Sequence, residues 1–303
     1  MIPEKQVSLQ EHARELEPEL AKLIVAIGDM TVPLQNEFPH RLMGVKNAPN
    51  KYGEVVAELD SWANGFICDR LIKTGLVRKI YSEELESPLL YNESAPFVVT
   101  LDPLDGSSNI ASNNPFGTIV GIYRKDLPCK GRELVASLFK LYGPVTTIVL
   151  ATKKGVHEYV KHRTGQANYM LLHESMKLPE KGKVIGFGGD ITDYPEQIYK
   201  FTKSLVKEKK LKLRYCGAFV GDFSQVLHYG GLFMYPMLLN KPEGKLRLTY
   251  EGIPMGNIVE RAGGKSSNGK CSLLEIMPKD VDGRTPLYVG NREIVEALEK
   301  ALA

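Results

Sequence analysis

The stretch Asp102–Asn109, which reads Asp-Pro-Leu-Asp-Gly-Ser-Ser-Asn, is the feature that most constrains how this chain can fold. An apolar, β-branched run at residues 97–101 comes directly before it and predicts a buried strand. Two carboxylates three residues apart thus stand where a strand ends. Gly106 lets the backbone approach a ligand closely, and the serines after it offer N–H and hydroxyl groups. The stretch predicts a site that holds a hard cation by carboxylates and a phosphate by backbone donors.

A second acidic pair, Glu83-Glu84, follows another short apolar run at residues 76–80, which also predicts a strand. Taken alone, the first stretch could be an ordinary solvated turn rich in Asp, Gly and Ser. Acidic groups at two strand ends are harder to explain by folding, because clustered like charges repel each other. The two strings together therefore favour a metal and phosphate site.

Composition limits the class of protein. The chain has 43% hydrophobic and 25% charged residues and a formal net charge of +3, which is typical of a globular protein and argues against a nucleic-acid partner. No apolar run approaches the roughly 20 residues that a membrane span needs, and residues 1–6 lack a signal-peptide layout. The four cysteines form no CxxC pair, and the six histidines are scattered. We expect a cytoplasmic protein with reduced thiols, ordinary histidines and no membrane partner.

Hydrophobic periodicity and turn residues predict the other elements. Helices are expected at residues 8–35 with a break at Gly28 or Pro33, then over 60–71, 132–141, 194–210, 217–229, 251–262 and 292–302. Strands are expected at 117–123, 146–151, 155–160, 230–236, 246–250 and 287–290, and a loop at 40–53. Because helices and strands alternate irregularly, we expect an α/β (α+β) layered sandwich with mixed sheets and not a parallel doubly wound one.

Five strings carry a family resemblance: Ser82–Glu84, Asp102–Ile110, Gly117–Arg124, Gly244–Glu251 and Glu260–Lys265. In this order and spacing they resemble the Mg²⁺-dependent, lithium-sensitive sugar-phosphate phosphatases, and within them the class I fructose-1,6-bisphosphatases. The resemblance implies the α-β-α-β-α sugar-phosphatase fold and a homotetramer built as a dimer of dimers. It also implies hydrolysis of the 1-phosphate of D-fructose 1,6-bisphosphate to fructose 6-phosphate, in gluconeogenesis or sugar-phosphate cycling.

The same resemblance assigns the metal and water chemistry. Two or three Mg²⁺ ions per subunit, with Mn²⁺ as an alternative, would be bound by Glu83, Asp102, Asp105, Glu251 and the Leu104 carbonyl. Glu84 with Asp60, beside Glu83, would orient and deprotonate the attacking water. From the residues alone, Asp60 could instead be a helix cap and Glu251 a glutamate favoured in the first turn of a helix.

The substrate contacts are implied in the same way. Asp105, Gly106, Ser107 and Ser108 would hold the reacting phosphate. The sugar and distal phosphate would be bound by Tyr215, Tyr235, Lys245 and, across a subunit interface, Arg214. Tyr215 and Tyr235 could instead be half-buried tyrosines that pack in a sheet. Glu54 would lie on a mobile loop that closes on the metals. The metal ligands would lie mostly in an N-terminal domain at residues 1–175, and the distal-phosphate site in a C-terminal domain at 176–303.

Alternative functions stay open. Tyr142-Gly143-Pro144 with Thr146-Thr147, and Ser266–Gly269, are similar to sedoheptulose-1,7-bisphosphatase, so that enzyme or a dual bisphosphatase is an alternative. An inositol-phosphate monophosphatase would not need the distal cluster. A non-catalytic relic would have lost one of the acids, all of which are present. The AMP site of gluconeogenic relatives is matched only at Arg124.

Overall fold

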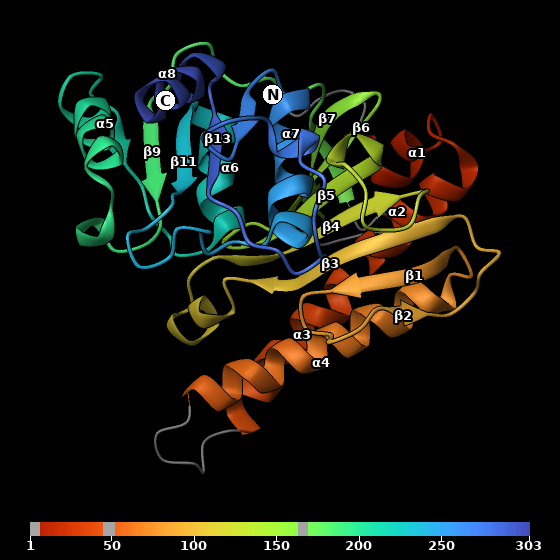
Figure 1. Cartoon of the computed structure of the whole chain (residues 1–303). Helices are drawn as coiled ribbons and strands as arrows, with labels where there is room; N and C mark the ends of the chain where they lie inside the picture. The colour runs from red at the N-terminus through yellow and green to blue at the C-terminus, as the bar shows by residue number, and fades with distance from the viewer. Residues whose placement is uncertain (1–6, 45–51, 163–168) are drawn as a thin grey trace.

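A computed structural model describes residues 7–44, 52–162 and 169–303, without the side chains of residues 42–44 and 52–57. Its framework is an eight-stranded and a five-stranded sheet (Figure 1). The large sheet has the spatial order β2 (Leu89–Leu90), β1 (Val77–Ser82), β3 (Phe97–Asp105), β4 (Phe116–Tyr123), β5 (Leu134–Tyr142), β6 (Thr147–Thr152), β7 (Gly155–Lys161) and β8 (Tyr169–His173). In it, β1 and β3 are parallel and the other neighbouring pairs are antiparallel.

The small sheet has the order β10 (Lys212–Leu213), β9 (Val184–Phe187), β11 (Gly231–Tyr235), β13 (Leu287–Gly290) and β12 (Lys265–Ser267). Strand β9 is parallel to both of its neighbours, whereas β13 is antiparallel to both of its own. Both sheets are therefore mixed, as the irregular alternation of elements predicts.

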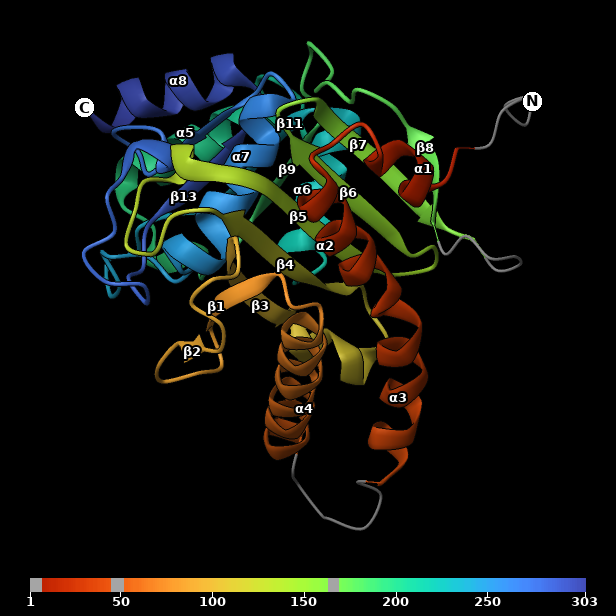
Figure 2. The same ribbon diagram turned by 90° about the vertical axis from the view of Figure 1, so that its right-hand side faces the viewer.

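Helices complete a five-layer sandwich. One face of the large sheet is covered by α1 (Leu9–Ala13), α2 (Pro18–Asp29), α3 (Thr31–Gly44) and α4 (Tyr52–Lys73), and Figure 2 shows α3 and α4 side by side. The middle layer is α6 (Phe219–Tyr229) and α7 (Ile253–Arg261), which contact both sheets. The far face of the small sheet is covered by α5 (Glu196–Lys207) and α8 (Arg292–Leu302). The predicted α-β-α-β-α arrangement is confirmed.

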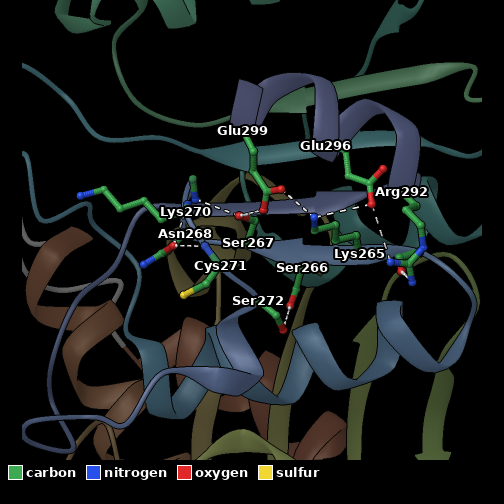
Figure 3. A network of polar contacts seen from close by, with 12 residues as sticks. Lys265, Ser266, Ser267, Asn268, Lys270, Cys271, Ser272, Arg292, Glu296 and Glu299 are labelled. Atoms are coloured by element: carbon green, nitrogen blue, oxygen red, sulfur yellow. Dashed lines mark hydrogen bonds and ion pairs between the residues drawn. The ribbon is translucent and has the colours of Figure 1, made fainter. Parts of the chain in front are cut away.

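Polar pairs fix α8 on the small sheet. Its apolar face, which includes Val295 and Leu298, is fully buried. At its edge the Glu299 carboxylate accepts hydrogen bonds from Lys265 Nζ and from Ser267 Oγ, both at 2.6 Å (Figure 3). The next turn is closed by Asn268, whose Oδ1 accepts from two backbone N–H groups. The Ser266–Gly269 segment thus has a structural role at β12 and α8.

Several sequence predictions of local structure are wrong. The helix expected over residues 132–141 is wrong, because a 3₁₀ turn at Gly131–Glu133 leads into strand β5, which begins at Leu134. A strand buried on both faces has a continuous apolar pattern that periodicity cannot distinguish from a buried helix. Residues 246–250 are not a strand, since Leu248–Gly252 form a π-helical turn that runs into α7. The helix expected over residues 8–35 is three helices, and the breaks lie at residues 14–17 and at Met30.

The loop predicted over residues 40–53 is shorter than expected. Helix α3 continues to Gly44 and α4 begins at Tyr52. Glu54, assigned to that loop, has its backbone in the first turn of α4, and its side chain lies outside the described residues.

Candidate active site

A β-bulge brings the two aspartates of the central stretch together. Strand β3 continues to Asp105 and does not end before Asp102, as the sequence predicted. Asp102 pairs with Ile119 and Asp105 with Gly117, so β3 takes three steps where β4 takes two. Residues three apart on a regular strand point to opposite faces, and the extra residue cancels that alternation. Both carboxylates therefore line the same cleft.

Hydrogen bonds hold this bulge in place. Asp102 Oδ1 accepts from the Leu104 N–H at 3.1 Å, and the Thr118 hydroxyl donates to the Pro103 carbonyl at 2.9 Å. Both aspartates are less than 9% exposed. The bulge is thus a buried, fully positioned feature and not a solvated turn.

Gly106 brings this strand end against the start of α6. Its φ is +74°, and a Cβ built on it would lie 2.3 Å from the Ala218 Cβ, so no other residue fits. Next to it, Asp105 Oδ2 accepts the Val220 N–H at 2.7 Å, which satisfies one of the free donors at the N-terminus of α6. The helix start and the metal-binding stretch are therefore one unit.

Glu251 completes a cluster of three carboxylates. The π-helical turn carries it into the cleft, where it is 5% exposed and its Oε2 accepts the Arg247 N–H at 2.6 Å. Carboxylate oxygens of Asp102, Asp105 and Glu251 all lie within 4.8 Å of one another. Glu83 lies beside them at the end of β1, with Oε1 2.8 Å from Arg247 Nε.

Burial and, after it, the crowding of negative charge shift the pKa values in this cluster. Burial, followed by the charges of Glu83 and the other carboxylates, raises the pKa of Asp102 and Glu251 well above the ordinary range. Burial also raises the pKa of Asp105 to about 7, against hydrogen bonds from the start of α6. Oxygen donors with uncompensated charge are what a hard divalent cation requires. The residues present therefore fit a Mg²⁺-type ion.

Helix α4 places Asp60 in the same cleft. The Ser82 hydroxyl donates to Asn64 Oδ1 at 2.7 Å, which fixes α4 against the end of β1 just before Glu83-Glu84. Asp60 lies in the interior of α4, so the alternative interpretation as an N-cap is wrong. Burial and the charges of Glu84 and Glu83 raise the pKa of Asp60 to about 7, although a hydrogen bond with Ser107 lowers it. The pKa of Glu84 is also raised, by burial and then by Glu83.

One cleft of about 350 Å³ contains nearly all of the predicted site residues. They are Asp60, Glu83, Glu84, Asp102, Leu104, Asp105, Gly106, Ser107, Ser108, Tyr215, Tyr235, Lys245 and Glu251. Arg214 is not brought into this cleft: its side chain is exposed and its N–H donates to the Ile185 carbonyl at 2.8 Å.

The cleft is also lined by basic and aromatic side chains. Lys245 Nζ lies 5.4 Å from the ring centre of Tyr235. That ring lies directly over Gly188, where an added Cβ would come within 2.2 Å of it. Tyr215 is 61% exposed, so the alternative of a half-buried packing tyrosine does not describe it. These groups and the carboxylate cluster line the same cavity.

Sequence motifs missed three polar residues at or beside the cleft. Arg284 lines it and donates from Nη1 to the Lys245 carbonyl. Asp222, on α6, lines it and accepts the Cys216 N–H at 2.9 Å, and burial raises its pKa to about 6. Arg247 pairs with Glu83. Arg247 lies within one of the strings that carry the family resemblance and could have been found from it. Arg284 forms an isolated β-bridge with Arg247, in a segment without a recognisable sequence pattern.

Comparisons with known families agree with this geometry. The profile described as "Fructose-1-6-bisphosphatase, N-terminal domain" matches residues 1–174, and the one described as "Fructose-1-6-bisphosphatase, C-terminal domain" matches residues 178–303. The chain belongs to the fructose-1,6-bisphosphatase family. It is accordingly a hydrolase of phosphate esters.

Individual relatives lie within the same family. The chain is 44% identical over 253 residues to fructose-1,6-bisphosphatase class 1 of Natronomonas pharaonis, covering 84% of this chain and 88% of that one. It is 40% identical over 294 residues to the class 1 enzyme of Methanocorpusculum labreanum, covering 96% and 90%. The crystal structure of Leishmania major fructose-1,6-bisphosphatase in its T-state aligns with a TM-score of 0.87 and 28% identity, over 98% of this chain and 99% of that one.

Two further findings concern the family's other features. Arg124, which matches the AMP site of gluconeogenic relatives, forms an ion pair with Glu17 and packs over the Phe97 ring. Among the described helices, none is both long enough and apolar enough to cross a membrane.

Proposed function

We propose that this fructose-1,6-bisphosphatase family member hydrolyses the 1-phosphate of D-fructose 1,6-bisphosphate, which releases fructose 6-phosphate and phosphate. The observation that carries the proposal is the single cleft that is lined both by a carboxylate cluster and by Tyr215, Tyr235, Lys245 and Arg284. A substrate with a phosphate at each end requires both sets of side chains. A monophosphatase would require only the carboxylate cluster.

The carboxylate cluster would hold the catalytic cations. Asp102, Asp105 and Glu251 are the central ligands in this proposal, with Glu83 and the Leu104 carbonyl beside them, for two or three Mg²⁺ ions or for Mn²⁺. A divalent cation bound there supplies positive charge that polarises the phosphate and lowers the pKa of water. The chain's own contribution is to bury and orient oxygen donors that repel one another until a cation neutralises them.

Asp60 and Glu84 would act as the general base that accepts a proton from the attacking water. A carboxyl whose pKa is about 7 can accept a proton near neutral pH far more effectively than one with an ordinary pKa. The water oxygen forms the new bond to phosphorus as the bond between phosphorus and the sugar oxygen breaks. The leaving sugar oxygen then takes up a proton. Ser107, which hydrogen-bonds to Asp60, links the base to the phosphate cradle that starts at Gly106.

The cradle and the distal site would orient the substrate. Gly106, Ser107 and Ser108 lead into the 3₁₀ helix Ser107–Ser112, whose first N–H groups suit phosphate oxygens. Tyr215, Tyr235 and Lys245 would bind the sugar and the distal phosphate, and Arg284 adds a guanidinium that the sequence did not predict.

We also propose a cytoplasmic homotetramer. Arg214 is exposed and outside its own chain's cleft, which supports a role in the neighbouring subunit's site. All four cysteines are free thiols, in agreement with a reducing compartment. The boundary between residues 175 and 176 and the closing role of Glu54 stay predictions.

The sedoheptulose-bisphosphatase alternative loses its main support. Tyr142 is buried and its hydroxyl lies 3.0 Å from Thr118 Oγ1, behind the bulge. Ser267 hydrogen-bonds to Glu299 on α8, and Asn268 accepts the Lys270 N–H in the next turn. Neither segment lines the cleft, so their similarity to that enzyme says nothing about sugar length.

Phosphate release from fructose 1,6-bisphosphate, sedoheptulose 1,7-bisphosphate and inositol 1-phosphate tests this function, in wild type and in Glu84→Gln. We expect the first substrate to be preferred and the variant to lose at least about 100-fold in kcat. The matched control is Glu86→Gln, an exposed glutamate two residues along and outside the cleft, which should keep full activity. Preference for inositol 1-phosphate would contradict the proposal that the cleft binds a second phosphate.

A further inference from the structure

Three side chains from distant parts of the chain form a second polar cluster. Glu158 lies on β7, His173 at the end of β8, and His228 near the end of α6. Glu158 Oε2 lies 2.7 Å from His173 Nδ1 and 3.0 Å from His228 Nε2. The three ligand atoms all fall within 4.8 Å of one another. None of the three lines the catalytic cleft.

The two nitrogens of His228 both face oxygen acceptors. Nε2 faces the Glu158 carboxylate, and Nδ1 lies 2.8 Å from the Ser224 carbonyl, which can only accept. A neutral imidazole carries a single N–H and can satisfy one of these oxygens. The second nitrogen must therefore carry an additional proton or share a cation with the carboxylate.

The surroundings favour a cation at this point. Glu158 is 2% exposed, and a buried carboxylate needs a compensating positive charge. His228 is the last residue but one of α6, where the helix dipole also favours positive charge. The Nδ1 contact to Ser224 is the kind of outer hydrogen bond that orients a metal-binding histidine with Nε2 toward the ion.

We propose that Glu158, His173 and His228 form a structural binding site for a borderline divalent transition ion such as Zn²⁺. Two imidazoles and one carboxylate are a donor set that suits Zn²⁺ and not Mg²⁺, which prefers oxygen. Metal–nitrogen bonds of about 2.0–2.1 Å in a tetrahedron place ligand atoms about 3.3 Å apart. The distances from Glu158 Oε2 to His228 Nε2 and to His173 Nδ1 therefore need to open by about 0.3 and about 0.6 Å. His173 is half exposed, which leaves a fourth position for water.

Such an ion would connect the edge strand β8 to α6. The opposite end of α6 donates the Val220 N–H to Asp105 in the catalytic cleft. The ion would therefore stabilise the helix that supports the active site without belonging to it.

Cobalt and zinc titrations of the purified full chain test the site. Excess Mg²⁺ is present throughout, so that the all-oxygen cluster is saturated with Mg²⁺. We expect one equivalent of Co²⁺ to give the intense visible bands of a four-coordinate site with nitrogen ligands, and Zn²⁺ to displace it and to raise the melting temperature.

His173→Ala is the decisive variant, because its exposed side chain can be removed without disturbing the core. Loss of a direct ligand should weaken Zn²⁺ binding by more than the roughly 10–100-fold that outer-shell changes cost. Its Mg²⁺-dependent phosphatase activity should be unchanged, which separates this proposal from the proposed function. Glu158→Gln should also abolish the bands. The matched control His40→Ala removes an exposed imidazole on α3 and should keep them.

A featureless Co²⁺ spectrum in wild type, with no change in melting temperature on adding Zn²⁺, would overturn the proposal. The cluster would then be an imidazolium–carboxylate bridge. Bands that persist in His173→Ala would equally contradict it, because the ion would be bound elsewhere.

Discussion

Two buried clusters of the molecule contain carboxylates whose pKa values are shifted in opposite directions. In the catalytic cleft, burial and neighbouring acids raise the pKa of Asp102 and Glu251. At β7, burial again acts to raise the pKa of Glu158, but hydrogen bonds from His228 and His173 outweigh it and the pKa is lowered. Because burial is similar, the neighbours decide the sign. The first cluster contains repelling charges that a ligand can neutralise, whereas in the second the two histidines compensate the carboxylate when no metal ion is bound.

Asp102→Asn should produce the largest effect. It removes a central oxygen donor for the cations and keeps the Oδ1 that accepts from Leu104. We expect kcat/KM for fructose 1,6-bisphosphate to fall by about 10³-fold or more. In EDTA the variant should melt at a higher temperature than wild type, because one repelling charge is gone. Wild-type activity in the variant would contradict the role of Asp102 as a cation ligand. A lower melting temperature than wild type in EDTA would contradict the repulsion among the buried carboxylates.

Asp60→Asn should lower kcat by about 10²–10⁴-fold through loss of the base. Since the pKa of Asp60 is about 7, wild-type kcat/KM should rise with pH up to about 7 and then level off. The variant should lose that acidic limb, as measured by phosphate release between pH 5 and 9. Glu58→Gln, an exposed change on the same helix, is the control and should retain the limb.

The pH dependence of stability should change with Mg²⁺. In EDTA the folded state holds protons on Asp60 and Asp105 up to about pH 7, whereas the unfolded chain releases them near 3.8. The folded state thus binds more protons across that window, and stability must fall as pH rises through it. Saturating Mg²⁺ should flatten this dependence. Urea denaturation at pH 5 and 8 measures it, and equal EDTA values at both would refute the raised pKa values.

In EDTA, Glu158→Gln should lower the stability of the folded protein, whereas Asp102→Asn should raise it. The amide loses the charge that both imidazoles require, which should cost about 1–3 kcal/mol in the free energy of unfolding. The exposed neighbour Glu174→Gln serves as the control and should have almost no effect. If Glu158→Gln is as stable as wild type, the two clusters do not differ as described.

Sequence reasoning located the catalytic cluster because its acids follow apolar strands in short, specific strings. It did not predict the bulge between Asp102 and Asp105, which depends on how β3 pairs with β4. It also assigned residues 246–250 to a strand, because Leu248 and Tyr250 are apolar and a π-helical turn has no distinct periodicity. The family resemblance supplied the role of Asp60, because its sequence context alone also allowed a helix cap.

The second cluster lay beyond the reach of sequence patterns. Glu158 is 15 residues from His173 and 70 from His228, and only the packing of α6 between the sheets brings them together. Without that packing the histidines are scattered residues, as we interpreted them from the sequence. Arg284 escaped for the same reason, since it reaches the cleft through the tertiary pairing of residues 284 and 247.

The most direct test of the cation-binding role of the carboxylate cluster is phosphate release from fructose 1,6-bisphosphate. It is measured in Mg²⁺, then after EDTA is added, and then after Mg²⁺ is restored. The carboxylate cluster predicts turnover in Mg²⁺, its loss in EDTA and its full recovery. Turnover that continues unchanged in EDTA would contradict the role assigned to Asp102, Asp105 and Glu251.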